Sequence, residues 1–246
     1  MYDELELDQI LATLASLRAR IGERFPDSSL SKVAAELYRI GTDVGPLLAR
    51  VRRPHWGLRT GLLVLIALMV GVLVLVTQRF RISVDVQGIG GLLQAIEAAA
   101  QDLIFLSLAV YFLFTVENRL RRRASLRALH RLRSIVHIVD MHQLRKDPEH
   151  LIAPGNRTPS SPECCMTRFE LVRYLDYCSE LLSIASKLAA LHVQHDNDPV
   201  VLDAVNDIET LAANLSNRMG QKILILDNAL LVAGRDAPLH VGEPAD

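Results

Sequence analysis

The sequence predicts an all-α fold: a two-span transmembrane helical hairpin that carries a cytosolic helical bundle. Half of the residues are hydrophobic but only 5% are aromatic, a composition that favours helices over a β-sandwich or barrel. Two apolar segments, separated by a short loop, suit helices that cross a bilayer. The rest of the chain repeats apolar residues at spacings of three and four, which is typical of helices that pack on helices.

Residues 54–78 are predicted to form the first span. Gly61 to Thr77 contains no ionisable residue. With the residues from Trp56 onward, the segment approaches the roughly 20 residues that an α-helix needs to cross a bilayer. Trp56 is expected at the membrane interface, where an amphipathic ring is well placed. The residues before position 60 do not resemble a cleavable signal peptide, so we expect an uncleaved anchor.

Residues 98–117 are predicted to form the second span. Leu103 to Val116 is apolar for fourteen residues, which is too short to cross alone. The preceding residues from Leu92 are good helix formers, and a helix from Leu92 to Val116 would be about 37 Å long at 1.5 Å per residue. The second span therefore depends on an extension of its helix.

Residues 79–97 are predicted to form an extracytoplasmic loop and the start of the second helix. Polar and apolar residues alternate from Ile82 to Val86, which predicts a brief extended turn. The glycines that follow, at positions 88, 90 and 91, are expected to act as a hinge.

Charges around the two spans predict their orientation. Arginines precede or open the first span at positions 50, 52, 53 and 59, and more follow the second span from Arg119 onward. The connecting loop contains only Arg79 and Arg81, which Asp85 and Glu97 offset. The positive-inside rule therefore predicts a multi-pass protein of the plasma (inner) membrane with both termini cytoplasmic.

Residues 1–53 are predicted to form cytosolic N-terminal helices. The first has a packing seam at three- and four-residue spacing, which is too short to require a coiled coil. The second is expected to stop near Gly41, with GTDVGP as a turn. The two seams are Leu7, Ile10, Leu14, Leu17 and Ile21, and Leu30, Val33, Leu37 and Ile40.

Residues 118–234 are predicted to form the cytosolic bundle. The second membrane helix is expected to continue as a rod to Pro148, and residues 153–163 to form a loop. Thr167 and Glu170 predict a capping box. Asp198 and Pro199 predict the start of the last helix.

Two packing stripes are predicted in the C-terminal half of the chain, followed by a flexible tail at residues 235–246. No helix shows two distinct apolar faces, so we expect self-association, as an oligomer, to complete the burial. The stripes are Leu171, Leu175, Cys178, Leu182, Ala185, Ala189 and His192, and Val205, Ile208, Ala212, Leu215, Met219, Ile223, Leu226 and Leu230.

His137 and Asp140 are weak candidates for metal ligands. On a helical wheel they share a polar stripe with His130 and Arg133, and the centre of the apolar face, which includes Leu132 and Val136, lies well over 90° from that stripe. A metal site needs a third ligand from another helix, and the candidates are His192, Asp203 and Asp207. We therefore expect no metal and no cofactor, and an Asp140 that pairs with His137 or Arg133. A metal-dependent hydrolase is the third functional hypothesis.

Seven arginines lie between Glu117 and Arg133. Those nearest to the second span are expected to bind the membrane surface through anionic lipid heads. These are Arg119, Arg121, Arg122 and Arg123. No nucleic acid is expected as a partner, because no aromatic residues interleave the arginines.

Gln101 and Asp102 are polar residues near the outer end of the second span. Intramembrane polar groups indicate an alternative function, an oligomeric channel or membrane-perturbing effector. The position of Asp102 near the end of the span favours an anchoring role instead.

The leading functional hypothesis is a membrane protein without catalysis. The sequence contains packing stripes but no convergent catalytic set, and its three cysteines at positions 164, 165 and 178 are expected to be reduced thiols. The predicted role is to anchor a cytosolic interaction or scaffold domain. The expected partners are the lipid bilayer, a second copy of the chain and an unknown cytosolic protein.

Overall fold

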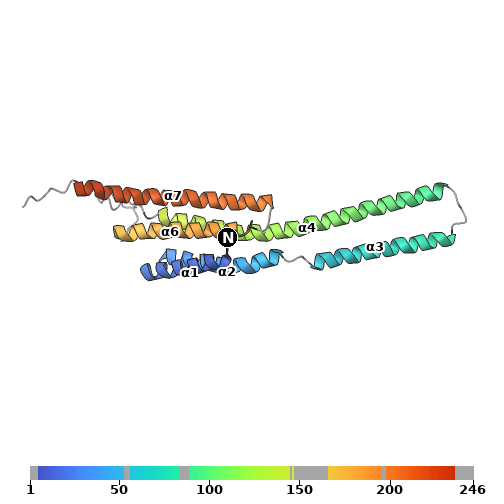
Figure 1. Ribbon diagram of the computed structural model, residues 1–246, viewed down its shortest axis with the longest axis horizontal. Helices are drawn as coiled ribbons and strands as arrows, with labels where there is room; N and C mark the ends of the chain where they lie inside the picture. The colour runs from blue at the N-terminus through green and yellow to red at the C-terminus, as the bar shows by residue number, and fades with distance from the viewer. Residues whose placement is uncertain are drawn as a thin grey trace, which may run out of the picture. The chain divides into compact units, whose positions relative to one another are not determined.

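The computed structural model describes residues 5–52, 56–83, 89–144, 146, 166–194 and 198–235. In this part of the chain every regular element is a helix, so the all-α prediction is confirmed (Figure 1). The helices are α1 (Leu7–Arg24), α2 (Ser29–Arg52), α3 (Trp56–Ser83), α4 (Ile89–Leu144), α6 (Arg168–Ala190) and α7 (Pro199–Arg235).

The chain divides into two compact units. The first, called the bundle here, comprises Met1–Leu48 and Ser125–Asp246, and the second, called the hairpin, comprises Ala49–Ala124. The bundle contains α1, α6, α7 and the parts of α2 and α4 that fall within its bounds. The hairpin contains α3 and the first part of α4, which run in opposite directions (Figure 1).

The two N-terminal helices pack through the seams that the sequence predicts. In α1, Ile10, Leu14, Leu17 and Ile21 are all buried. In α2, the four predicted seam residues, from Leu30 to Ile40, are also buried. The periodicity of three and four was therefore sufficient to find both faces, because each helix buries one stripe.

The predicted stop of α2 near Gly41 is wrong, since the helix continues to Arg52 with Pro46 inside it. Gly41 is a contact point within the helix: a Cβ atom there would lie 2.9 Å from Leu11 Cδ2 and 3.5 Å from Leu188 Cδ1. One turn later, a Cβ on Gly45 would lie 3.0 Å from Leu7 Cδ2. The glycines are therefore explained by close helix packing rather than by a turn.

The turn between α3 and α4 also differs from the prediction. Ile82 and Ser83 belong to α3, while Gly90 and Gly91 belong to the first turn of α4. Residues 84–88, which include Gly88, lie outside the described part of the chain. The alternation from Ile82 was too short to distinguish a strand from the end of a helix.

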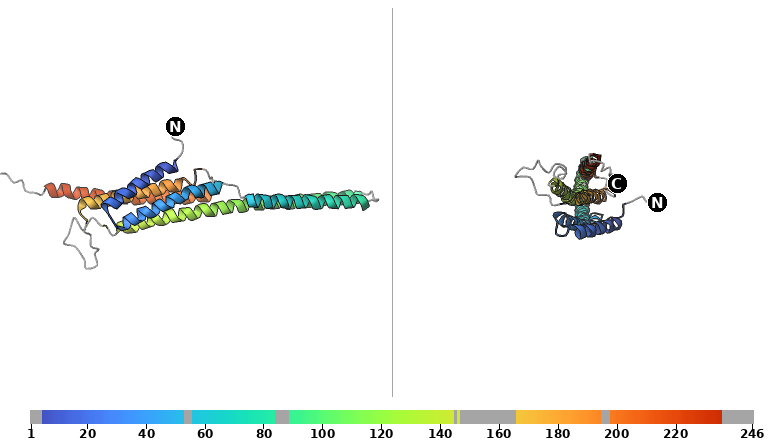
Figure 2. Two further views of the ribbon diagram at one scale, coloured as in Figure 1. Left: turned by 90° about the horizontal axis from the view of Figure 1, so that it is seen from below. Right: turned by 90° about the vertical axis from the view of Figure 1, so that its left-hand side faces the viewer.

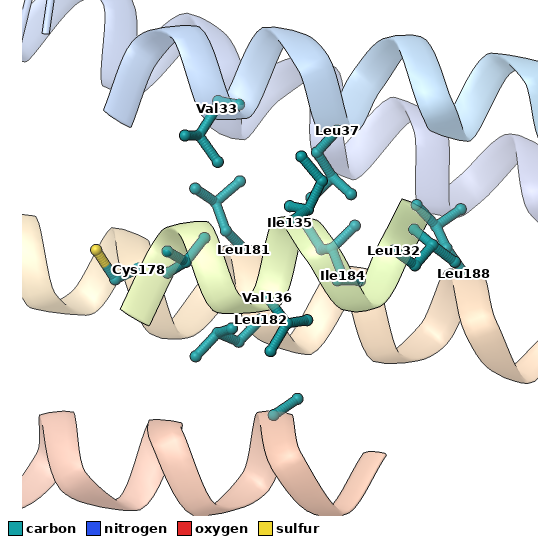
Figure 3. Packing of buried hydrophobic residues seen from close by; sticks show 14 of the residues in the cluster. Val33, Leu37, Leu132, Ile135, Val136, Cys178, Leu181, Leu182, Ile184 and Leu188 are labelled. Carbon is teal, nitrogen blue, oxygen red and sulfur yellow. The ribbon is translucent and has the colours of Figure 1, made fainter. Parts of the chain in front are cut away.

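The core of the bundle forms where α2, α4 and α6 meet (Figure 3). Val33 and Leu37 come from α2, and Leu132, Ile135 and Val136 come from α4. These side chains pack against a row on α6 that includes Leu181, Leu182, Ile184 and Leu188 (Figure 3). The apolar face that the sequence predicts for the end of α4 is thus part of the core.

Helix α6 is the central helix of the bundle, with α1 and α2 on one side and α7 on the other (Figure 2). Its predicted stripe from Leu171 to His192 is buried. A second set of buried residues lies beside it: Tyr174, Tyr177, Leu181, Ile184 and Leu188. The two sets join on a helical wheel into one continuous buried face about 180° wide, so α6 is more deeply buried than the predicted stripe alone would make it.

Two predicted helix starts are confirmed. Before α6, the Glu170 backbone N–H donates to Thr167 Oγ1 and the Thr167 backbone N–H donates to Glu170 Oε2 at 2.7 Å, which completes a capping box. Before α7, Asp198 Oδ1 accepts from the backbone N–H of Val200 at 2.9 Å, and Pro199 is the first helical residue. Each cap satisfies backbone N–H groups that have no partner within the helix.

The stripe on α7 is also confirmed, with buried residues from Val205 to Leu226. The side chain of Leu230 lies outside the described part. Arg168 at the start of α6 forms an ion pair with Asp227 in the last third of α7 at 2.6 Å, as expected for two antiparallel helices. Predictions on Pro148, on Cys164 and Cys165, on the loop 153–163 and on residues 236–246 also fall outside the described residues.

Candidate functional site

The hairpin exposes a belt of large apolar side chains. On α3 the exposed fractions range from 46% for Val74 to 66% for Val64, and on α4 they reach 70% for Tyr111. Soluble proteins rarely expose contiguous apolar patches of more than a few hundred Å². The apolar belt comprises Leu63, Val64, Leu65, Leu68, Val70, Val72, Val74 and Leu75 on α3, and Leu103, Ile104, Phe105, Leu108, Tyr111, Phe112 and Phe114 on α4.

One helical stretch among the described residues, Ala100–Leu144 in α4, is long and apolar enough to cross a membrane. Its most apolar window has a mean hydropathy of 1.5, and only 6% of that window is buried by the rest of the protein. A core helix of a soluble protein would be mostly covered. In α3, Leu63–Val72 is a shorter apolar stretch, while Trp56 at the head of that helix is 69% exposed.

The polar residues of the second predicted span differ in their surroundings. Ser107 Oγ donates to the Leu103 carbonyl at 2.8 Å, and Thr115 Oγ1 donates to the Tyr111 carbonyl at 2.9 Å. Both hydroxyl groups are thus satisfied within α4 and need no water or neighbouring helix. Gln101 is exposed and Asp102 is half-buried.

The four arginines predicted to bind the membrane surface differ in their surroundings. Arg121 Nη2 donates to Glu117 Oε1 at 2.6 Å, and the Glu117 side chain is only 6% exposed. Arg119 and Arg123 are exposed and form no ion pair or hydrogen bond within the described part. Arg122 is half-buried. A buried carboxylate needs a charged partner, so the role of Arg121 is to neutralise Glu117.

The polar stripe on α4 is divided among different partners. His130, Arg133 and His137 are exposed, and Asp140 accepts a hydrogen bond from Gln143 Nε2 at 2.7 Å. The expected pairing of Asp140 with His137 or Arg133 is not found. Arg133 instead lies 3.5 Å from Asp207 on α7.

No group of three or more His, Cys, Asp or Glu side chains that could hold a metal ion occurs among the described residues. His137 and Asp140 therefore have no third ligand there. Asp203 and Asp207, two of the proposed third ligands, are exposed on α7. The third, His192, is enclosed in the bundle. The expectation that His137 and Asp140 bind no metal stays a prediction.

His192 is a polar residue in an apolar environment. It follows the C-terminal end of α6 and is 2% exposed, and neither Nδ1 nor Nε2 has a hydrogen-bond partner among the described residues. Burial lowers the pKa of His192 to about 4, because the charged imidazolium loses its solvation. His192 is therefore neutral at physiological pH.

Cys178 is also enclosed, on the buried stripe of α6. Burial raises the pKa of the Cys178 thiol to about 12. Since the thiolate is the reactive form of cysteine, this thiol is chemically inert at neutral pH. It serves as a small apolar residue of the core, as the sequence spacing predicts.

Comparison of the chain with protein-family models, with curated proteins and with solved structures gave no significant match.

The surroundings of two residues were not predicted from the sequence. Glu117 follows an apolar run and precedes Arg121 by four residues, a spacing that would have indicated a helical ion pair. The isolation of His192 could not be read from the sequence, because its burial depends on helices that are far apart along the chain.

Proposed function

We propose that the chain is a two-span integral membrane protein whose hairpin anchors a cytosolic helical interaction or scaffold domain. The main observation behind this proposal is that the two units differ in the burial of their apolar side chains. The bundle encloses an apolar core that includes Leu14, Leu132 and Leu182, whereas the hairpin exposes its belt. Lipid tails are the environment that makes exposed Leu, Val and Phe side chains favourable.

The lengths of the helices support two spans. α3 contains 28 residues, or about 42 Å at 1.5 Å per residue, and the hydrocarbon core of a bilayer is about 30 Å thick. The apolar belt on α4 begins at Leu103, and the helix starts earlier, at Ile89. Its first turns therefore supply the length that the fourteen apolar residues lack.

The charges support an orientation with both termini in the cytoplasm of a cell with a plasma (inner) membrane. Arg50 and Arg52 close α2 before the first span, and the arginines from Arg119 follow the second. Basic residues near the ends of spans are retained on the cytoplasmic side. This topology gives the bundle access to cytosolic proteins.

The surface of the bundle supports a role in association, without catalysis. Gln143 Oε1, near the end of α4, accepts a hydrogen bond from Lys222 Nζ on α7 at 2.8 Å, so the end of α4 lies beside the middle part of α7. Each helix has an exposed apolar side chain two residues from this hydrogen bond, with Met141 67% exposed on α4 and Leu224 59% exposed on α7. Apolar groups of this kind are enriched in the central parts of protein interfaces. Self-association or binding of a cytosolic protein would cover them.

The interaction role is tested by crosslinking two differently tagged copies of the full chain in native membranes. We expect the tags to co-purify, and Leu224→Asp to reduce the yield on the order of tenfold because a charge would enter the interface. Asn217→Asp adds the same charge at an exposed polar position of α7 and should have no effect. Tags that never co-purify, with no other protein attached, would contradict the proposal.

A further inference from the structure

The lipid-facing stripe of α4 continues into two arginines on the same face of the helix. At 100° per residue, Phe105, Leu108, Phe112, Arg119 and Arg123 fall within about 60° of one another. Phe105, Leu108 and Phe112 are 58%, 60% and 68% exposed, and both arginines are exposed as well. On this face of α4, within the hairpin, the exposed apolar residues are therefore followed by two positively charged ones.

The opposite face of the helix has a different composition. Glu117 and Arg121 lie about 160° away from Arg119 on the wheel, and they neutralise each other in the 2.6 Å ion pair. Arg119 and Arg123 have no acidic partner among the described residues. The positive charges of Arg119 and Arg123 therefore lie on the same face of α4 as the exposed phenylalanines.

The positions along the helix match the head-group layer of a bilayer. Counted from Phe114, the last residue of the belt, Arg119 lies about 7.5 Å farther along the axis and Arg123 about 13.5 Å. The head groups add about 5 to 7 Å to each side of the hydrocarbon core. Helical side chains lean toward the N-terminus, which for α4 means back toward the belt. Both guanidinium groups can therefore reach the phosphate level.

We infer that Arg119 and Arg123 bind the phosphate groups of anionic phospholipids at the membrane surface, whereas Arg121 does not. This inference rests on the proposed membrane location of the hairpin. The planar guanidinium donates paired hydrogen bonds to phosphate oxygens. The site thus selects lipids with net negative charge, because a zwitterionic head group carries its own cation beside the phosphate.

The test compares the affinities of phosphatidylglycerol and phosphatidylcholine for the purified full chain in neutral detergent, measured by native mass spectrometry. We expect about a 25-fold preference for phosphatidylglycerol, or about fivefold for each arginine near a lipid phosphate. The double variant Arg119→Gln with Arg123→Gln should lose the preference. Arg121→Gln should keep it while lowering the thermal stability, because the buried Glu117 loses its ion pair with Arg121.

A matched control removes two other exposed cations, through Lys32→Gln with Arg218→Gln, and should leave the preference intact. The inference is wrong if the Arg119 and Arg123 variant keeps the preference, or if the control loses it equally. Alkaline carbonate extraction distinguishes a failure of the arginine site from a failure of the proposed membrane location. A wild-type chain that leaves the membrane at alkaline pH contradicts the proposed function itself, whereas a retained chain without lipid preference contradicts only the arginine site.

Discussion

Acidification to about pH 4.5 is expected to destabilise the bundle by about 2 to 3 kcal/mol through His192 alone. The pKa of this histidine is lowered from 6.5 to about 4 in the folded protein. The unfolded chain therefore binds more protons between these two values. Stability is complete above about pH 6.5 and falls as the pH decreases toward 4, which urea unfolding at several pH values would measure.

Replacing His192 with Leu should remove this pH dependence. At neutral pH the variant should gain about 1 to 3 kcal/mol, since two buried nitrogens without partners are replaced by apolar atoms. His137→Leu, at an exposed position of α4, is the matched control and should retain the acid sensitivity. Equal slopes of stability against pH in wild type and His192→Leu would show that His192 has a partner or is solvated.

The second large effect is expected from Leu108→Arg in the middle of the apolar belt. An arginine at the centre of a membrane span costs about 2.5 to 3.5 kcal/mol of insertion free energy. The proposed second span has little apolar surplus, with fourteen apolar residues from Leu103 to Val116. We therefore expect most of the variant to be released by alkaline carbonate, while the wild type remains in the membrane pellet.

Leu224→Arg provides the matched control, because Leu224 on α7 is 59% exposed and Leu108 is 60% exposed. The two leucines differ in the proposed environment, which is water or a protein partner for Leu224 and lipid for Leu108. If both variants are extracted equally, or if neither is, exposure on α4 does not indicate contact with lipid.

The parts of the fold that depend on local sequence were predictable. The seam of α1, the capping box at Thr167 and the start of α7 at Pro199 each follow from residues within a few positions of one another. Their spacing determines which side chains share a face, and their side-chain oxygens determine where a helix begins.

The parts that depend on distant contacts were not predictable in the same way. Gly41 was read as a helix stop because glycine is common at helix ends. In the structure Gly41 instead lies inside α2, where the absence of a side chain lets Leu11 and Leu188 approach its backbone closely. The width of the buried face of α6 and the isolation of His192 likewise follow from the packing of α6 against several other helices. The difference between Arg121, which pairs with Glu117, and the exposed Arg119 and Arg123 could not be predicted either. It depends on the burial of Glu117, which the sequence does not show.

The central claim, a membrane hairpin with its bundle in the cytoplasm, is tested most directly by thiol labelling in intact spheroplasts. Cys164 and Cys165 are first replaced by Ser, while buried Cys178 can stay because its raised pKa makes it unreactive. Single cysteines are then placed at Gln87, between the spans, and at Ala213, which is exposed on α7. The account predicts that an impermeant maleimide labels position 87 in intact spheroplasts and position 213 only after permeabilisation. Labelling of position 213 in intact spheroplasts, or protection of position 87, would contradict it.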